Sequence, residues 1–289
     1  MSEFVKRTLS GTVFVACIVG SIVWNPWLFA GLIIPISLLA VDEFHRLVKS
    51  STATRVYASL ATLLLWITFI CLAYLPSEES RPQALGVALG IAYLSLMTVA
   101  LLDEIWNHSG QPLRNWGNIL ISQFMIAMPL LTLLFLAGLD KWLLLALFVL
   151  IWVNDTGAYC VGTLTAKRPQ GNHKMTPHIS PKKSWEGLIG GIAFCIGASL
   201  ILYACGWFEV FHAGPYTILI AVCFAILTSL FGTMGDLMES LFKRSIGVKD
   251  SGHFLPGHGG VLDRFDSILL ASPVITAFSL LCYFIAPLL

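Results

Sequence analysis

The sequence predicts an all-α fold, a polytopic transmembrane helical bundle. Of the 289 residues, 57% are hydrophobic and only 11% are charged, and the mean hydropathy is +0.82. The apolar residues come in runs of about 20, the length of helix that crosses a hydrocarbon core of about 30 Å. These runs are apolar all round, whereas the strands of a membrane barrel alternate apolar and polar side chains. The pattern therefore favours helices over a barrel.

Nine apolar segments are candidate spans. Only Asn25 and Pro26 separate the first two, and Gly138 and Leu139 lie between the fifth and sixth, so we expect tight turns at both places. An alternative for residues 10–41 is one span followed by a re-entrant or interfacial segment. The expected spans are 10–24, 27–41, 57–75, 83–102, 117–137, 140–160, 185–206, 216–234 and 267–287.

The distribution of basic residues predicts the orientation. With nine spans and a cytoplasmic N-terminus, fifteen of the 17 Lys and Arg residues fall on the cytoplasmic side, the bias typical of membrane proteins. The loops 161–184 and 235–266 are then both cytoplasmic, and the C-terminus faces outward. The basic N-terminus resembles that of a signal peptide, but no convincing small-residue cleavage site follows it. The first segment is therefore interpreted as a retained span.

The chain divides into two parts by the placement of its polar residues. Residues 1–140 form an N-terminal hydrophobic transmembrane region whose acids lie at span ends, where we interpret them as solvated interfacial carboxylates. Residues 141–289 form a C-terminal transmembrane region that carries nearly all the polar chemistry and is interpreted as the catalytic part. The net charge of +1 excludes a general affinity for nucleic acid. The acids of the first region are Asp42, Glu43, Asp103 and Glu104.

A polar stripe continues the eighth span. If the helix extends past residue 234, Asp236, Glu239, Ser240 and Lys243 fall on one face, because residues three and four apart are neighbours on a helix. Carboxylates near a bilayer are costly and usually line a cavity or meet a cation. The alternative is an ordinary interfacial Glu–Lys pair.

A glycine-rich segment follows the stripe. It contains Lys249 and Asp250, then His258, Gly259 and Gly260. Backbone N–H groups in such a segment can turn towards an anion, and basic side chains can neutralise phosphates. The alternative is a flexible loop without a ligand.

The ninth span opens with Asp263, Arg264 and Asp266. Acids at this point suit the N-terminus of a helix, which is one interpretation. The other is that carboxylates at the mouth of a span hold Mg²⁺, which takes one or two carboxylates and completes its shell with water and substrate phosphates.

The other cytoplasmic loop offers a second group of candidates. Asp155 ends a long apolar run, so we expect it inside the bundle. Lys182 and Lys183 are either basic anchors of the positive-inside kind or phosphate ligands. Ser184 suits a helix cap, with Glu186 in the first turn.

These residues carry a resemblance to a known family. Ser240, Lys243-Arg244, Lys249-Asp250, Gly252, Leu255-Pro256, His258-Gly259-Gly260, Asp263-Arg264 and Asp266 stand at fixed spacing over 27 residues. This pattern resembles the signature of phosphatidate cytidylyltransferases, also called CDP-diacylglycerol synthases. The segments from Asp155 to Gly162 and from Ser180 to Gly187 are similar to that family as well. The likeness extends over residues 150–267, and residues before 150 share only the general hydrophobic layout of the family.

The resemblance implies an enzyme of phospholipid biosynthesis. Such a nucleotidyltransferase takes CTP and phosphatidate to CDP-diacylglycerol and pyrophosphate, with Mg²⁺, at the cytoplasmic face of a bacterial-type inner membrane. The implied partners are CTP, phosphatidate and the lipid bilayer, without nucleic acid, and a homodimer stays open. Three alternatives are a CTP-dependent polyprenol or lipid kinase, a CDP-alcohol phosphotransferase, whose Asp-rich motif is not found here, and a cation transporter.

The expected roles follow from charge and from the resemblance. We expect Asp236 and Asp263 to meet across the site as metal ligands, with Asp266 as a third. The phosphate ligands would be Lys243, Arg244, Lys249 and Arg264, next to Asp250, and the turn His258-Gly259-Gly260 would cradle the triphosphate. Asp155, Lys182, Lys183 and Glu186 would complete the site.

Overall fold

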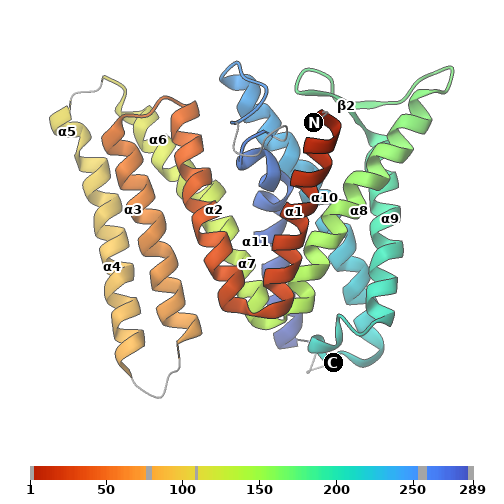
Figure 1. The fold of residues 1–289 in the computed structure, drawn as a ribbon, viewed down its shortest axis with the longest axis horizontal. Helices are drawn as coiled ribbons and strands as arrows, with labels where there is room; N and C mark the ends of the chain where they lie inside the picture. The colour runs from red at the N-terminus through yellow and green to blue at the C-terminus, as the bar shows by residue number, and fades with distance from the viewer. Residues whose placement is uncertain (1–2, 76–79, 108–109, 253–258, 286–289) are drawn as a thin grey trace.

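The computed structural model describes residues 3–75, 80–107, 110–252 and 259–285 of the chain. Long helices dominate it, and the all-α bundle predicted from the sequence is confirmed (Figure 1). The helices are α1 (Glu3–Trp24), α2 (Pro26–Leu47), α3 (Thr52–Phe69), α4 (Ser80–Leu102), α5 (Glu104–Asn107), α6 (Pro112–Ser122), α7 (Met128–Leu139), α8 (Lys141–Ala166), α9 (Trp185–Ala204), α10 (Thr217–Ser245) and α11 (Leu262–Ile285). Short π-helical turns, η1 (Ile70–Tyr74) and η2 (Gln123–Ala127), extend α3 and join α6 to α7.

Three smaller features complete the described chain. Strands β1 (Lys174–Thr176) and β2 (Ser180–Ser184) form an antiparallel hairpin between α8 and α9. Two 3₁₀ turns, η3 (Glu209–Phe211) and η4 (Gly214–Tyr216), lie between α9 and α10.

Eight helical segments of the described chain are long and apolar enough to cross a membrane. The ninth candidate is α1, whose apolar part, Gly11–Trp24, is shorter than the others. Residues 10–41 do form two helices, which turn at Asn25, where the side-chain Oδ1 accepts the N–H of Trp27 at 2.8 Å. The nine-span count and the cytoplasmic N-terminus stay predictions.

Three helices extend beyond the expected spans towards the polar segments. The expected ends were 160 and 234, whereas α8 runs to Ala166 and α10 to Ser245, and α11 begins at Leu262 rather than at 267. The predicted continuation of the eighth span as a polar helix is therefore confirmed. The expected loops 161–184 and 235–266 therefore shorten to 167–184 and 246–261. The added turns of α10 carry paired polar side chains, whereas the added turn of α8 packs closely on α9.

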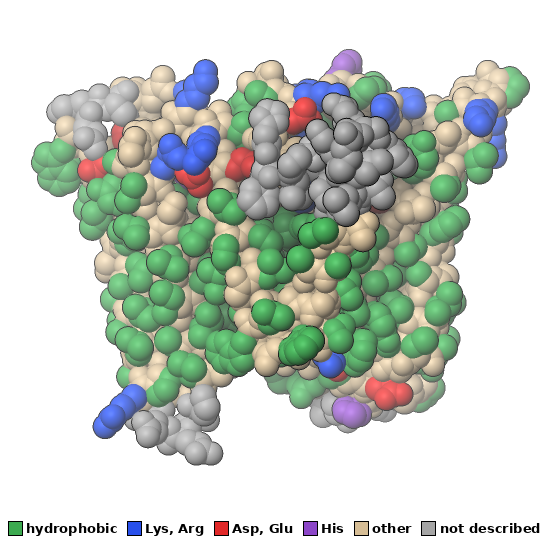
Figure 2. Space-filling model, in the orientation of Figure 1, with side chains coloured by type: hydrophobic (Ala, Val, Ile, Leu, Met, Phe, Trp, Pro, Cys, Tyr) green, Lys and Arg blue, Asp and Glu red, His purple; other side chains and the backbone are tan. Residues whose placement is uncertain are grey.

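The two ends of the bundle differ. The first turns of α1, the β1–β2 hairpin and the end of α10 lie together, and α11 runs from there to the opposite end (Figure 1). We call the end of the bundle that carries the β1–β2 hairpin the hairpin end. Charged side chains gather near the two ends of the visible face, with a broad hydrophobic belt between them (Figure 2). This distribution is the one expected of a helical bundle that spans a bilayer.

Close packing of α8 on α9 positions the polar residues of both. A Cβ atom at Gly190 would overlap Val161 of α8, and one at Gly191 would overlap the Asn154 side chain. Small residues at a helix interface let two backbones approach closely, which is a common device in membrane bundles. The hairpin that connects these helices is thereby held beside the end of α10.

Candidate functional site

Two adjoining cavities lie at the hairpin end. The first, of about 280 Å³, lies beside β2, and we call it the hairpin cavity. The second, of about 260 Å³, lies between α1, α8 and the start of α11, and we call it the α1 cavity. Asp155 and Asp236 line both, so the two cavities meet at this pair of acids.

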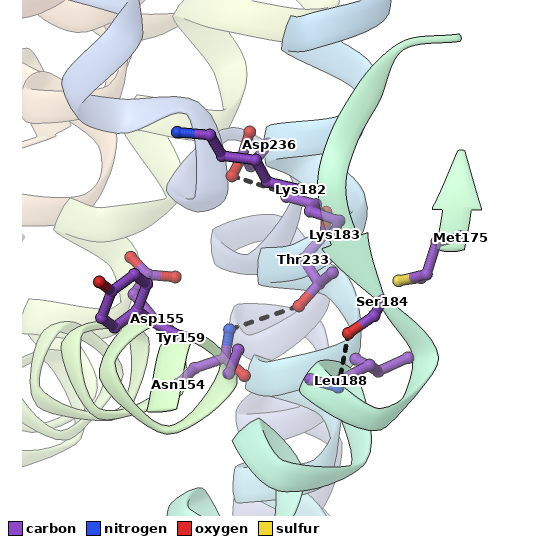
Figure 3. Close-up of a pocket in the computed structure, with 12 residues that line it drawn as sticks. Asn154, Asp155, Tyr159, Met175, Lys182, Lys183, Ser184, Leu188, Thr233 and Asp236 are labelled. Carbon is purple, nitrogen blue, oxygen red and sulfur yellow. Dashed lines mark hydrogen bonds and ion pairs between the residues drawn. The ribbon is translucent and has the colours of Figure 1, made fainter. Parts of the chain in front are cut away.

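The hairpin cavity is polar on the side of β2 and α10. Lys183 of β2 forms an ion pair with Asp236 of α10, with 2.7 Å between Nζ and Oδ2, and also donates to the carbonyl oxygen of Thr233 (Figure 3). Lys182 lines the same cavity and is exposed. The predicted cap is confirmed, because Ser184 Oγ accepts the N–H of Gly187 at the start of α9.

Asn154 fixes the part of α8 that carries Asp155. Its Nδ2 donates to Thr233 Oγ1 of α10 at 3.3 Å (Figure 3). Its Oδ1 accepts a hydrogen bond from Ser229, also on α10, at 2.5 Å. Asp155 itself is exposed, on the wall of both cavities. Asp155 therefore lies between the helices of the bundle, where the cavities leave its side chain open.

Asp266 of α11 lines the α1 cavity together with Asp155 and Asp236, and the like charges of these acids repel one another. Its Oδ1 accepts the N–H of Ser267 at 2.6 Å. Lys183 offsets part of this charge. Such a cluster at a low-dielectric boundary favours a cation.

Asp263 has a different environment, although it lines the α1 cavity together with Asp236 as expected. Its Oδ1 accepts from Lys243 Nζ at 2.6 Å, and its Oδ2 accepts from the N–H groups of Ser251 and Gly260, each at 2.9 Å. Both oxygens are therefore engaged by donors of this chain. The bond from Gly260 also supports the capping interpretation, because a side chain in the first turn reaches back to the backbone before the helix.

Lys243 lies between two acids of its own chain. Its Nζ lies 2.5 Å from Glu239 Oε2 and 2.6 Å from Asp263 Oδ1. The Lys243 side chain is 13% exposed and that of Glu239 only 3%. This position favours a structural ion pair over an ammonium group that is free to meet a substrate phosphate.

The remaining predicted site residues differ in their exposure to solvent and in their contacts. Arg244 is exposed, and its Nη1 donates to the Val248 carbonyl at 3.3 Å. Lys249 and Asp250 are exposed as well, and Arg264 lines the α1 cavity. Glu186 accepts from the backbone and the ring of His173 on the hairpin. His258 lies outside the described residues.

The glycine turn was expected to cradle a triphosphate with its N–H groups. Gly259 has φ +82°, a conformation that glycine adopts without strain. The N–H of Gly260 points to Asp263, and those of Val261 and Leu262 point to a carboxylate of α2. These N–H groups thus meet protein carboxylates, not an open anion site.

The α2 carboxylate is Glu43, which sequence reasoning assigned to a solvated interface. That interpretation is wrong, because Glu43 accepts three hydrogen bonds from the segment before α11 and its first turn. Its neighbour Asp42 pairs with Arg46 and Arg55. The only signal in the sequence was the position of both acids at a span end. Phe14 and Val15 of α1 line the α1 cavity and were not predicted either, because an apolar residue within a span gives no sign that it lines a cavity.

The described residues contain no group of three or more His, Cys, Asp or Glu close enough to hold a metal ion by themselves. Mg²⁺ commonly keeps only one or two protein carboxylates and takes its other ligands from water and phosphate. Asp155, Asp236, Asp263 and Asp266 line the α1 cavity and offer that donor chemistry. Lys183 and Ser240 engage the oxygens of Asp236, whereas Lys243 and two backbone N–H groups engage those of Asp263 more closely.

Fold and site together define an integral helical membrane protein with a charged, two-part cavity at one end. The sequence matches the cytidylyltransferase family over residues 5–282, and the chain belongs to this family. It is 45% identical over 128 residues to a phosphatidate cytidylyltransferase of Staphylococcus epidermidis. It is 47% identical over 128 residues to one of Staphylococcus aureus. Each alignment covers 44% of this chain and 45% of the relative, so the chain matches about half the length of these proteins.

Proposed function

We propose that this protein transfers a cytidylyl group from CTP to phosphatidate, giving CDP-diacylglycerol and pyrophosphate for phospholipid biosynthesis. One observation carries the proposal. A cavity with lysine side chains and a cavity with apolar α1 side chains share the acids Asp155 and Asp236. A reaction between a water-soluble polyanion and a lipid phosphate needs such a pair of compartments at a membrane boundary. The family membership and the names of the relatives agree with it.

The two cavities suit the two substrates. Lys182 and Lys183 in the hairpin cavity suit the phosphates of CTP, because ammonium groups neutralise phosphate charge. Phe14 and Val15 on the wall of the α1 cavity suit the glycerol and upper acyl part of phosphatidate. The phosphate of the lipid would then lie near Arg264 and the shared acids.

In the proposed reaction, a phosphate oxygen of phosphatidate attacks the α-phosphorus of CTP. A new P–O bond forms, the bond from the α-phosphorus to the bridging oxygen breaks, and pyrophosphate leaves with the electron pair. The second pKa of a phosphate monoester is about 6, so the nucleophile is already largely ionised and no strong general base is required. The protein's tasks are to bring two polyanions together and to neutralise their charge.

Asp236 and Asp266, with Asp155, are the residues that we propose would hold Mg²⁺. The ion would offset the negative charge of the triphosphate and of the leaving pyrophosphate. Lys183 forms an ion pair with Asp236 and so couples the hairpin to this position. Asp263 would then order the start of α11 instead of binding metal.

We further propose that the hairpin end faces the cytoplasm of a cell with this protein in its inner membrane. CTP is cytosolic, and the excess of basic residues predicted for the cytoplasmic side supports this orientation. A homodimer is the assembly to test, by the mass of the detergent-solubilised protein in multi-angle light scattering.

The decisive experiment uses purified protein in phosphatidate-containing micelles with CTP labelled at either the α- or the γ-phosphorus. We expect α-label in the lipid product and γ-label in released pyrophosphate. Label from the γ-position in lipid would instead show a kinase, and no label in lipid would contradict both reactions. Lys183→Met should reduce transfer, whereas Lys174→Met serves as the control because Lys174 is exposed on the same hairpin.

A further inference from the structure

One side chain of the N-terminal region reaches the start of α11. Glu43 Oε1 accepts a hydrogen bond from the Ser251 hydroxyl at 2.5 Å and from the N–H of Leu262 at 3.1 Å. Its Oε2 accepts from the N–H of Val261 at 2.9 Å. Both oxygens of a single carboxylate are thus used, and they join segments on the two sides of residues 253–258.

The contact has the chemistry of a helix cap supplied from elsewhere in the chain. The first N–H groups of a helix have no partner within it and carry a partial positive charge, so a carboxylate at this point stabilises them. Glu43 provides that carboxylate from a position 218 residues before Val261.

The carboxylate of Glu43 lies so close to Gly252 and Gly260 that neither position has room for a side chain. A Cβ atom at Gly252 would lie 2.7 Å from Glu43 Oε2, and one at Gly260 would overlap both Glu43 and Ser251. Two of the glycines in this segment therefore allow the carboxylate to approach the backbone. The close fit indicates a specific contact.

Ser251 joins this contact to Asp263. Its hydroxyl donates to Glu43, while its N–H donates to Asp263 Oδ2. Gly260 donates to the same Asp263 oxygen. A continuous series of polar contacts thus runs from α2 through Ser251 to the first turn of α11, the turn whose Arg264 and Asp266 line the α1 cavity.

We infer that Glu43 is a positioning residue for the transfer reaction: it fixes the start of α11 and thereby places the cavity-lining residues Arg264 and Asp266. This inference rests on the proposed function for its catalytic consequence. Glu43 acts through the backbone of α11. A displacement of the cavity-lining residues by about 1 Å can lower the reaction rate on the order of 100-fold.

The test compares Glu43→Gln with Asp42→Asn as purified full-length proteins. An amide offers one acceptor oxygen where three donors converge, and its NH₂ group faces a backbone N–H. We expect kcat to fall about 10-fold or more in Glu43→Gln, with the KM values for CTP and phosphatidate changed less than about threefold. Asp42→Asn removes the neighbouring charge on the same helix and should keep the kcat of the wild type.

A second measurement does not depend on turnover. Hydrogen–deuterium exchange of the Ser251, Gly260, Val261 and Leu262 amides should be faster in Glu43→Gln, while exchange in α3 and α4 is unchanged. Wild-type exchange at these amides, or wild-type kcat, would overturn the inference. If the wild type itself transfers no α-label to lipid, the proposed function fails, and exchange alone decides whether Glu43 holds the start of α11.

Should Glu43→Gln fail to fold, Ser251→Ala takes its place, because it removes one of the three hydrogen bonds to Glu43 and the link from Glu43 to the Asp263 contact. It should lower kcat in the same way with little change in KM. An unchanged kcat in Ser251→Ala would then contradict the inference.

Discussion

Replacing Lys243 by methionine should destabilise the protein more than it weakens substrate binding. Methionine keeps most of the side-chain length but removes the ammonium group that lies between Glu239 and Asp263. The side chains of these acids are only 3% and 9% exposed, so water cannot replace the lost partner. Breaking a buried ion pair from one side typically costs about 3–5 kcal/mol, because the remaining charge is left uncompensated.

That loss is large against a total stability of about 5–15 kcal/mol. It should lower the melting temperature of the detergent-purified protein by roughly 6–15 °C, measured by gel filtration of heated samples. Arg244→Met is the matched control. Arg244 is next to Lys243 in the sequence and is exposed, so the loss of its guanidinium group should change the melting temperature little. Adding Glu239→Gln to Lys243→Met should recover part of the loss, because it removes one of the two unpaired charges.

The opposite result would refute this reasoning. If Lys243→Met melts at the same temperature as Arg244→Met but shows a raised KM for CTP, Lys243 binds substrate phosphates, as expected from sequence alone. Its contacts with the two acids would then be replaced when substrate binds.

Three further predictions concern the site, the helix packing and the topology. Asp236→Asn should reduce turnover about 100-fold at saturating Mg²⁺, because the amide keeps the size but loses the charge; more than a tenth of wild-type activity would argue against a metal role. Gly191→Ala should cost about 1–3 kcal/mol by overpacking α8 against α9, whereas Gly197→Ala, with open space around it, should be neutral in the same melting assay. Reporter fusions after residues 172 and 212 and at the C-terminus should read inside, outside and outside; a cytoplasmic C-terminus would mean that one span is miscounted.

The helices could be predicted because their causes are local. Apolar runs of sufficient length specify spans, and the four polar residues from Asp236 to Lys243 fall on one face only if the helix continues. The Ser184 cap depends on a residue three positions away. Helix ends were the least accurate part, since α8 and α10 continue where the hydrophobicity has already stopped.

The contacts of the site were harder to predict because they join distant parts of the chain. The position of Asp263 beside the α1 cavity follows from its place at the start of α11, but its partner Lys243 lies 20 residues away. Nothing in the residues around Glu43 shows that its carboxylate meets Leu262, 219 residues later. A charge pattern identifies which residues are unusual in a membrane chain, whereas packing decides which of them meet.

The contact between α2 and the start of α11 also bears on how the protein is made. During synthesis at about 5–20 residues per second, Val261 follows Glu43, 218 positions earlier, after roughly 10–40 s. Glu43 stands at the end of α2, not within its apolar stretch, so the carboxylate can stay hydrated during that interval. Helix α11 thus brings backbone donors to a carboxylate that was synthesised long before it. The contact can form only after the start of α11 has been made.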